Sequence, residues 1–346
     1  MRDNSVTISK ALAIILMVMV HARCPIWAQH YISMYHMPLF LFMSGYCFKE
    51  SHLVDTKGFI IKKLKTVYWP FVKWNLVFIL LHNLFFYFNI YNVYYPFHGC
   101  PSHPYDIAET IKQAFYIIFT MSGCEQLLGG FWFLKALFWG NIIFFAVRKC
   151  VHNLWLGGAL LVALTIIATA IGRNIPFFSI GYKEIMASLF IWSGYVYHHS
   201  SYHFERHWAV ILLCAVFVAF GSFFWQGSML RIEWPIILPY ILTALVGTLM
   251  TFGISFYAEK VTSIRKILII VGNNTLEILI WHFLAFKIVN LILIIFYHLP
   301  ITRLAEFPVM DEYAYRGWWV AYLVIGILFP LILTKIVNKV KFLNRM

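Results

Sequence analysis

Ten stretches of this chain are apolar over about 20 residues, the length at which an α-helix crosses the hydrocarbon core of a bilayer. They cover residues 6–24, 31–48, 70–91, 127–147, 153–171, 181–199, 208–225, 234–257, 271–297 and 318–337. The 346 residues are 62% hydrophobic and only 12% charged, whereas soluble domains carry about 25% charged residues. We therefore predict an all-α fold, a polytopic membrane helix bundle with about ten transmembrane helices, as one membrane-embedded domain over residues 1–346.

Two features lie outside this regular pattern. Residues 107–121 are too short and too mixed in polarity to span, so we expect an interfacial helix within the long loop 92–126. The sequence SGY occurs near the end of two predicted spans, at Ser44 to Tyr46 and at Ser193 to Tyr195. These matches are too short to establish an internal repeat.

The basic residues predict the orientation of the bundle. With both termini in the cytoplasm, sixteen Lys and Arg residues fall on the cytoplasmic side and six on the opposite side. This bias satisfies the positive-inside rule. The formal charge of +13 is thus explained by topology and by attraction to anionic membrane lipids. Nucleic acid is not an expected partner, because the basic residues are spread over many loops rather than gathered in one patch.

The six cysteines show neither a C-x-x-C motif nor a Cys/His spacing suited to zinc, and we expect no metal site. Cys100 and Cys124 both fall in the long outer loop, where a disulfide and two unbridged thiols are both open. The other four lie in or beside spans and are expected to pack there, namely Cys24, Cys47, Cys150 and Cys214.

Polar groups inside a membrane are costly, so each one suggests a functional role. Lys10 and His21 lie eleven residues apart in the first predicted helix. At about 100° and 1.5 Å per residue they share one face within about 20° and stand roughly 16 Å apart along the axis. Taken alone, this spacing also fits a lysine that extends to the headgroups and a histidine that hydrogen-bonds a neighbouring helix.

Four further segments follow in order along the chain. They read HMPLFLFMSGY at His36 to Tyr46, KKLKTVYWPF at Lys62 to Phe71, GGFWFLKALFWG at Gly129 to Gly140, and GNNTLEILIWHF at Gly272 to Phe283. With the Lys10–His21 pair, this series resembles the acyltransferase-3 family, the membrane O-acyltransferases that modify bacterial polysaccharides and related sugars. The chain departs from the family pattern at Thr7, where an acidic residue is usual, and at Thr275, where Ser is usual.

The resemblance implies transfer of an acetyl group from cytoplasmic acetyl-CoA, with no bound cofactor, to a hydroxyl of a sugar, glycan or lipid-linked glycan acceptor in the bacterial inner membrane. A neutral imidazole can take the hydroxyl proton, so we expect His21 to be the general base and His36 to orient or hydrogen-bond the site. An interfacial histidine that caps a helix start is the other interpretation of His36. The donor phosphates are expected at Lys10 and at the basic stretch Lys62, Lys63 and Lys65.

Further roles are assigned within the same motifs. We expect Trp132, Ser44 and His282 to contact the acceptor. Glu277 is a candidate catalytic residue, which could also pair with Lys10 or Lys135 or orient a histidine. Glu277 and His282 point about 140° apart on a helix, so they are not expected to form a dyad. A longer acyl donor such as succinyl-CoA is one alternative. A secondary transporter is another, although paired halves with broken helices are not evident.

Overall fold

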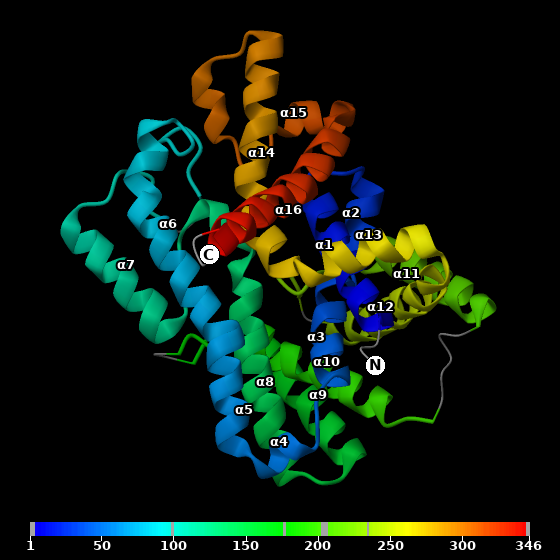
Figure 1. Cartoon of the computed structure of the whole chain (residues 1–346). Helices are drawn as coiled ribbons and strands as arrows, with labels where there is room; N and C mark the ends of the chain where they lie inside the picture. The colour runs from blue at the N-terminus through cyan, green and yellow to red at the C-terminus, as the bar shows by residue number, and fades with distance from the viewer. Residues whose placement is uncertain (1–3, 98–99, 176–177, 202–206, 234, 344–346) are drawn as a thin grey trace. The chain divides into compact units, whose positions relative to one another are not determined.

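The computed structural model of the protein describes residues 4–97, 100–175, 178–201, 207–233 and 235–343, with the backbone alone for 340–343 (Figure 1). Within these ranges every regular element is a helix, so the predicted all-α fold is confirmed. Arg2, Arg206 and Arg345, three of the sixteen residues predicted to be cytoplasmic, lie outside the described residues.

In chain order, the helices are α1 (Asn4–His21), α2 (Ile26–Ser33), α3 (His36–Tyr46), α4 (Ser51–Val54), α5 (Thr56–Lys63), η1 (Leu64–Tyr68), α6 (Trp69–Tyr87), α7 (Ile107–Thr120), η2 (Gln126–Phe131), α8 (Trp132–Cys150), α9 (Leu154–Ile171), α10 (Tyr182–His198), α11 (Trp208–Phe224), α12 (Ile237–Lys260), α13 (Thr262–Asn273), α14 (Thr275–Tyr297), η4 (Ile301–Ala305), α15 (Asp311–Tyr313), η5 (Ala314–Trp318) and α16 (Trp319–Leu343). The longest connection between consecutive helices follows α6.

Seven helical segments in the described part of the chain are long and apolar enough to cross a membrane. Each of the ten predicted spans contains a helix, but α3 has 11 residues, and α10 and α11 have 17 each. The predicted count of about ten crossings and the cytoplasmic position of both termini therefore stay predictions.

Two helix boundaries decide where the histidines of the motifs lie. The backbone leaves the helical path after His21, where Arg23 takes a positive φ of 59°. Pro25 follows at once and disfavours a helical conformation of the residue before it. The predicted span 271–297 is likewise divided, because α13 ends at Asn273 and Asn274 leaves the helical region with a φ of −117°. As a result, α1 ends on His21, and His282 lies in the first half of α14.

The described residues fall into two compact units, and each combines three separate stretches of the chain. Unit 1 comprises residues 1–13, 30–71 and 132–272. Unit 2 comprises residues 14–29, 72–131 and 273–346. The prediction of one membrane-embedded domain stays a prediction.

In unit 1, α10 packs against α3, α8 and α9. The two SGY segments meet at the contact between α3 and α10. A Cβ at Gly45 would lie 1.7 Å from the carbonyl oxygen of Ile191, and one at Gly194 would lie 2.0 Å from that of Phe42. Only glycine at both positions lets these backbones approach, as is common where helices pack in membranes. The two SGY segments thus form a reciprocal contact between α3 and α10.

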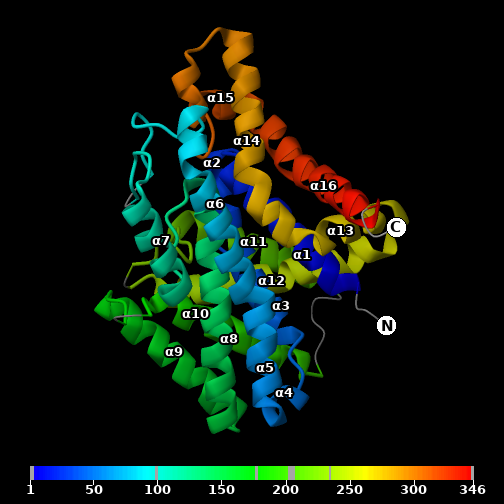
Figure 2. The same ribbon diagram turned by 60° about the vertical axis from the view of Figure 1, so that its left-hand side comes forward.

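In unit 2, α14 packs against α16, which runs at an angle to it (Figure 2), and also contacts η2 and η4. The side chains of α14 that face these partners include His282, Lys287 and Asn290, all of which are buried. Polar groups at such positions need partners inside the protein, because the surrounding apolar side chains offer none.

The long loop of unit 2 contains the predicted interfacial helix, α7, and its helical structure is confirmed. The helix begins with a capping box formed by Asp106 and Glu109. Its apolar side chains lie four residues apart along one face and are exposed, namely Ile107, Ile111, Phe115 and Phe119. A location in the membrane interface stays a prediction.

A buried pair of ionisable groups, His82 of α6 and Glu125, fixes the ends of this loop. His82 Nδ1 lies 3.1 Å from a Glu125 carboxylate oxygen, and Nε2 lies 3.1 Å from the carbonyl oxygen of His103. Both ring nitrogens of the buried imidazole therefore have a hydrogen-bond partner inside the protein. Tyr91 donates a further hydrogen bond of 3.1 Å to Glu125, and the buried carboxylate is thereby satisfied.

Cys100 and Cys124 lie side by side in the same loop, and no disulfide joins them. A hydrogen bond from the Cys100 thiol stabilises the thiolate of Cys124 and lowers the pKa of Cys124. The same bond, together with burial, raises the pKa of Cys100. A thiolate beside a second thiol is the arrangement from which a disulfide forms on oxidation.

The orientation can be tested with a cysteine introduced at Ser102, in a variant whose native cysteines are replaced by serine. We expect a membrane-impermeant maleimide to label this residue only from the outer face, because the charge bias places loop 92–126 outside. Labelling only from the cytoplasmic face would refute the predicted topology.

Oxidation of the loop thiols is a second prediction. We expect mass spectrometry without reductant to find the peptides that contain Cys100 and Cys124 linked. The bond would close a loop of about 25 residues and stabilise it by about 3 kcal/mol in the chain-entropy estimate. Cys24 and Cys214 serve as controls that stay unlinked. Separate, alkylatable thiols at both positions after treatment with a mild oxidant would contradict the pairing.

Candidate functional site

His21 and His282 form a hydrogen-bonded pair in unit 2. His21 is the last residue of α1 and is half-buried, whereas His282 in α14 has no contact with solvent. Nδ1 of His21 lies 3.0 Å from Nε2 of His282, and the rings are nearly parallel, with centroids 5.2 Å apart and planes inclined by 12°. Two histidines that are remote in sequence are therefore combined into one site.

The surroundings of His282 fix the tautomer of both rings. Nδ1 of His282 lies 3.0 Å from two carbonyl oxygens of its own helix, those of Ile278 and Leu279. These groups only accept, so Nδ1 of His282 carries a proton. A fully buried ring with no carboxylate partner is neutral, which leaves Nε2 of His282 as an acceptor. Nδ1 of His21 must then be the donor, and in a neutral imidazole the lone pair of His21 lies on Nε2.

Aromatic rings enclose the pair on one side. Phe283 lies 4.8 Å from the His21 ring and 3.9 Å from the His282 ring, measured between centroids. Phe307, from the segment after η4, packs on Phe283 at 4.7 Å. A Cβ at Gly130 of η2 would lie 3.0 Å from Leu279 and 3.9 Å from the His282 ring. Glycine at this position therefore lets η2 approach α14 beside the histidine.

Glu277 lies in unit 2 with the histidine pair but does not join it. It is half-buried in the first turn of α14, where a carboxylate is favoured by the helix dipole. Within the described part of this unit it forms no ion pair or hydrogen bond. Its predicted pairing with Lys10 or Lys135, which belong to unit 1, stays a prediction.

Three other predicted site residues lie in unit 1. His36 is buried at the start of α3, and its Nδ1 lies 2.8 Å from the carbonyl oxygen of Ile32. Ser44 donates a hydrogen bond of 3.1 Å to the side chain of Asn141 in α8. Trp132 is the half-buried first residue of α8. Hydrogen bonds to neighbouring helices account for His36 and Ser44 structurally, and the functional roles of all three stay predictions.

The four lysines predicted to bind the donor also belong to unit 1. Lys10 is half-buried in α1. In α5, the exposed Lys62 lies with its Nζ 3.4 Å from Nε2 of His52, and the half-buried Lys63 lies over the Phe59 ring. Lys65 is exposed in η1.

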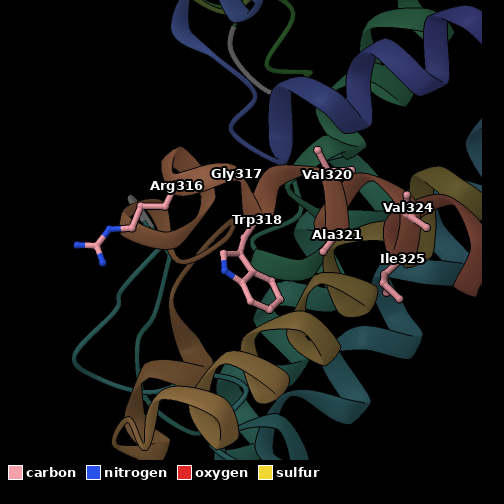
Figure 3. A pocket seen from close by; sticks show the side chains of 7 residues that line it. All are labelled: Arg316, Gly317, Trp318, Val320, Ala321, Val324 and Ile325. Carbon is pink, nitrogen blue, oxygen red and sulfur yellow. The ribbon is translucent and has the colours of Figure 1, made fainter.

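An open depression of about 580 Å³ lies along η5 and the start of α16 in unit 2 (Figure 3). It is lined by Arg316, Gly317, Trp318, Val320, Ala321, Val324 and Ile325. The guanidinium of Arg316 points away from the indole of Trp318 and pairs with Glu312 at 3.0 Å. The lining contains no group suited to acid–base chemistry and none of the predicted site residues. The histidine pair is therefore the stronger candidate for a catalytic site.

Several residues around the pair were not singled out from sequence. Phe283 ends the motif at 272–283, although the motif implies no role for it, and Phe307 is one of many aromatic residues with no distinguishing signal. Lys287 and Asn290 do carry one, because they are polar residues inside an apolar span on the same helix as His282.

The protein has several helical segments long enough to span a membrane, as expected of a multi-pass membrane protein. Its histidine pair, in which hydrogen bonds select the tautomer, is a candidate acid–base site. A family model described as an acyltransferase domain matches residues 3–335, nearly the whole chain. The protein therefore belongs to the acyltransferase-3 family, and it is a membrane acyltransferase, as the sequence motifs predict. No curated protein and no solved structure matches the chain.

Proposed function

We propose that this protein transfers an acetyl group from acetyl-CoA to a hydroxyl of a sugar or glycan acceptor in the bacterial inner membrane, with His21 as the general base. Membership of the acyltransferase-3 family supports the reaction class. The hydrogen bond between His21 and His282 is the observation that supports His21 as the base, because Nδ1 of His21 is the donor in this bond. The lone pair on Nε2 can then accept a proton from the acceptor hydroxyl.

The geometry favours a positioning role for His282 rather than contact with the acceptor. Its Nε2 faces His21, and its Nδ1 is held by carbonyl oxygens of α14. When His21 gains a proton, the resulting imidazolium donates a stronger hydrogen bond to the same nitrogen of His282. His282 would thus orient the base and stabilise its charged form, the role that a carboxylate has in a serine hydrolase triad.

In the proposed step, His21 carries one proton from the acceptor to the leaving thiolate. Nε2 of His21 takes the hydroxyl proton while the acceptor oxygen attacks the thioester carbonyl carbon. A C–O bond forms, the C–S bond breaks, and the CoA thiolate leaves. The imidazolium of His21 returns the proton to this thiolate, so the base is regenerated. No further reactant is needed.

Lys10 and the basic stretch of α5 and η1 would bind the donor phosphates. Desolvation and the nearby cations Lys62, Lys63 and Lys49 lower the pKa of His52. Such crowding of positive charge, with Lys62 and Lys65 exposed, favours a polyanion such as the nucleotide part of CoA. Lys10 lies eleven residues before His21 on the same helix, and the corresponding distance of roughly 16 Å is comparable to an extended pantetheine arm.

Substitution of the two histidines tests the assignment. We expect His21→Ala to lower kcat by roughly 10²- to 10⁴-fold, the usual contribution of a general base, with acetyl-CoA binding nearly unchanged. His282→Gln should also lower kcat while the donor affinity is retained, because the tautomer of His21 is no longer fixed. Radiolabelled acetyl-CoA and a membrane lipid extract provide the transfer assay, and competition by succinyl-CoA tests the acyl chain.

His152→Ala is the matched control, since this histidine is exposed between α8 and α9. It should leave transfer unchanged. Normal transfer by His21→Ala would remove His21 as the base, whatever the result for His282.

Substitution of Lys10 should impair binding of the donor, whereas substitution of His21 should impair the transfer step. We expect Lys10→Ala to weaken acetyl-CoA binding, measured by equilibrium dialysis, and Lys10→Arg to restore part of it because the charge survives. Lys112→Ala, an exposed cation on α7, serves as the control. Wild-type donor affinity of Lys10→Ala would show that the phosphates bind elsewhere.

A further inference from the structure

Three buried polar side chains of unit 2 are not explained by the histidine pair. Lys287 is 4% exposed, and Asn290 and Tyr322 have no contact with solvent. Lys287 and Asn290 belong to α14, and Tyr322 belongs to α16. Such groups in a membrane-spanning helix are costly unless they form hydrogen bonds, and they commonly have a function. Their partners therefore indicate what they do.

The two side chains of α14 bind the backbone of one segment, residues 304–310, which comprises the end of η4 and the loop after it and is here called the strap. Nζ of Lys287 donates to the carbonyl oxygen of Glu306 at 2.8 Å. Nδ2 of Asn290 is shared between the carbonyl oxygens of Leu304 and Glu306, each at 3.2 Å. The carbonyl of Glu306 thus receives hydrogen bonds from both side chains.

Tyr322 extends this network to the other end of the strap. Its hydroxyl donates to Oδ1 of Asn290 at 2.6 Å and accepts from the backbone N–H of Met310 at 3.2 Å. One hydroxyl therefore links α16, α14 and the strap. We call Lys287, Asn290 and Tyr322 together the clamp.

The opposite side of the strap is held by the long loop. The carboxylate of Glu306 contacts Arg303 and accepts a hydrogen bond of 3.1 Å from the hydroxyl of Tyr95. Asn92 donates to the carbonyl oxygen of Thr302 at 2.8 Å. The path of the strap is consequently determined from both sides.

Phe307 is the strap residue that reaches the catalytic candidate. Its ring packs on Phe283 at 4.7 Å and on Phe97 of the long loop at 5.3 Å. Phe283 in turn lies between Phe307 and the imidazoles of His21 and His282. A shift of the strap would move Phe307 away from Phe283. Phe283 could then move too, and the imidazole rings of the two histidines would no longer be held in their present orientation.

We propose that Lys287, Asn290 and Tyr322 are positioning residues, which hold the strap so that Phe307 and Phe283 keep His21 oriented and keep water away from the acyl donor. This inference rests on the proposed function. Water that reached the site would compete with the acceptor. Its proton would pass to His21, its oxygen would attack the thioester carbon, and the C–S bond would break to give the free carboxylic acid and CoA.

The test compares acyl transfer with acetyl-CoA hydrolysis in purified full-length protein. Tyr322→Phe removes one oxygen from the clamp, and Lys287→Met removes the amino group of Lys287 at similar length. In each variant we expect transfer to fall by roughly 3- to 10-fold, the effect of one lost hydrogen bond, and hydrolysis per transfer event to rise by a similar factor. The donor KM should be unchanged. Tyr315→Phe, which removes an exposed hydroxyl, is the control.

A second measurement does not depend on turnover. Diethyl pyrocarbonate modifies accessible imidazoles, and mass spectrometry can follow its reaction with His21. We expect faster modification of His21 in Tyr322→Phe and in Phe307→Ala. The second variant keeps every hydrogen-bonding group of the clamp and removes the ring over which Nζ of Lys287 lies, 5.9 Å from its centroid. A variant that fails to fold is recognised by its loss of cooperative thermal unfolding. The variants that do fold then test the positioning role of the clamp.

The outcomes separate this inference from the proposed function. An unchanged ratio of hydrolysis to transfer and an unchanged modification rate in folded clamp variants would overturn the positioning role, even if His21→Ala is inactive. Transfer by His21→Ala would instead overturn the proposed function, and the modification rates would still report on the clamp.

Discussion

His282 has no contact with solvent, so both nitrogens of its ring must find partners inside the protein. The carbonyl oxygens of the preceding turn of α14 accept a hydrogen bond from Nδ1–H. Only Nε2 of the ring then still needs a hydrogen-bond partner. His21 is this partner, and this single bond ties the end of α1 to α14. Gly130 then gives η2 room beside the same ring. The requirement to satisfy one buried imidazole thus places three segments of unit 2 and selects the tautomer of His21.

The need of buried polar groups for hydrogen-bond partners also explains the path of the strap. Its inward carbonyl groups would lack partners in an apolar environment, which is costly for backbone groups. Lys287 and Asn290 supply the donors, and Tyr322 completes the network by bonding Asn290 and the amide of Met310. The loop part of the strap, after η4 ends at Ala305, is therefore held close to the histidine pair. In α14, one helix presents the partner of the proposed base and the residues that fix the surroundings of that base.

Much of the helical architecture could be predicted from sequence, because the length and polarity of apolar segments are local properties. The family and the two histidines of the site could be identified from motifs. The contact between His21 and His282 could not, since it depends on how two helices 261 residues apart align, which periodicity does not determine. The role of Lys287 was hidden for a related reason. Its partner is a backbone carbonyl, and no residue type marks the path that brings this carbonyl to α14.

The separation of the two histidines also has a consequence for biosynthesis. The first helix leaves the ribosome long before α14, and 261 residues lie between the two imidazoles. At translation rates of about 5–20 residues per second, this interval lasts on the order of 10–50 s. During this time the nascent chain has His21 but not the residue that fixes its tautomer. A chain truncated before α14 would therefore lack the hydrogen bond that orients His21, on which the proposed mechanism depends.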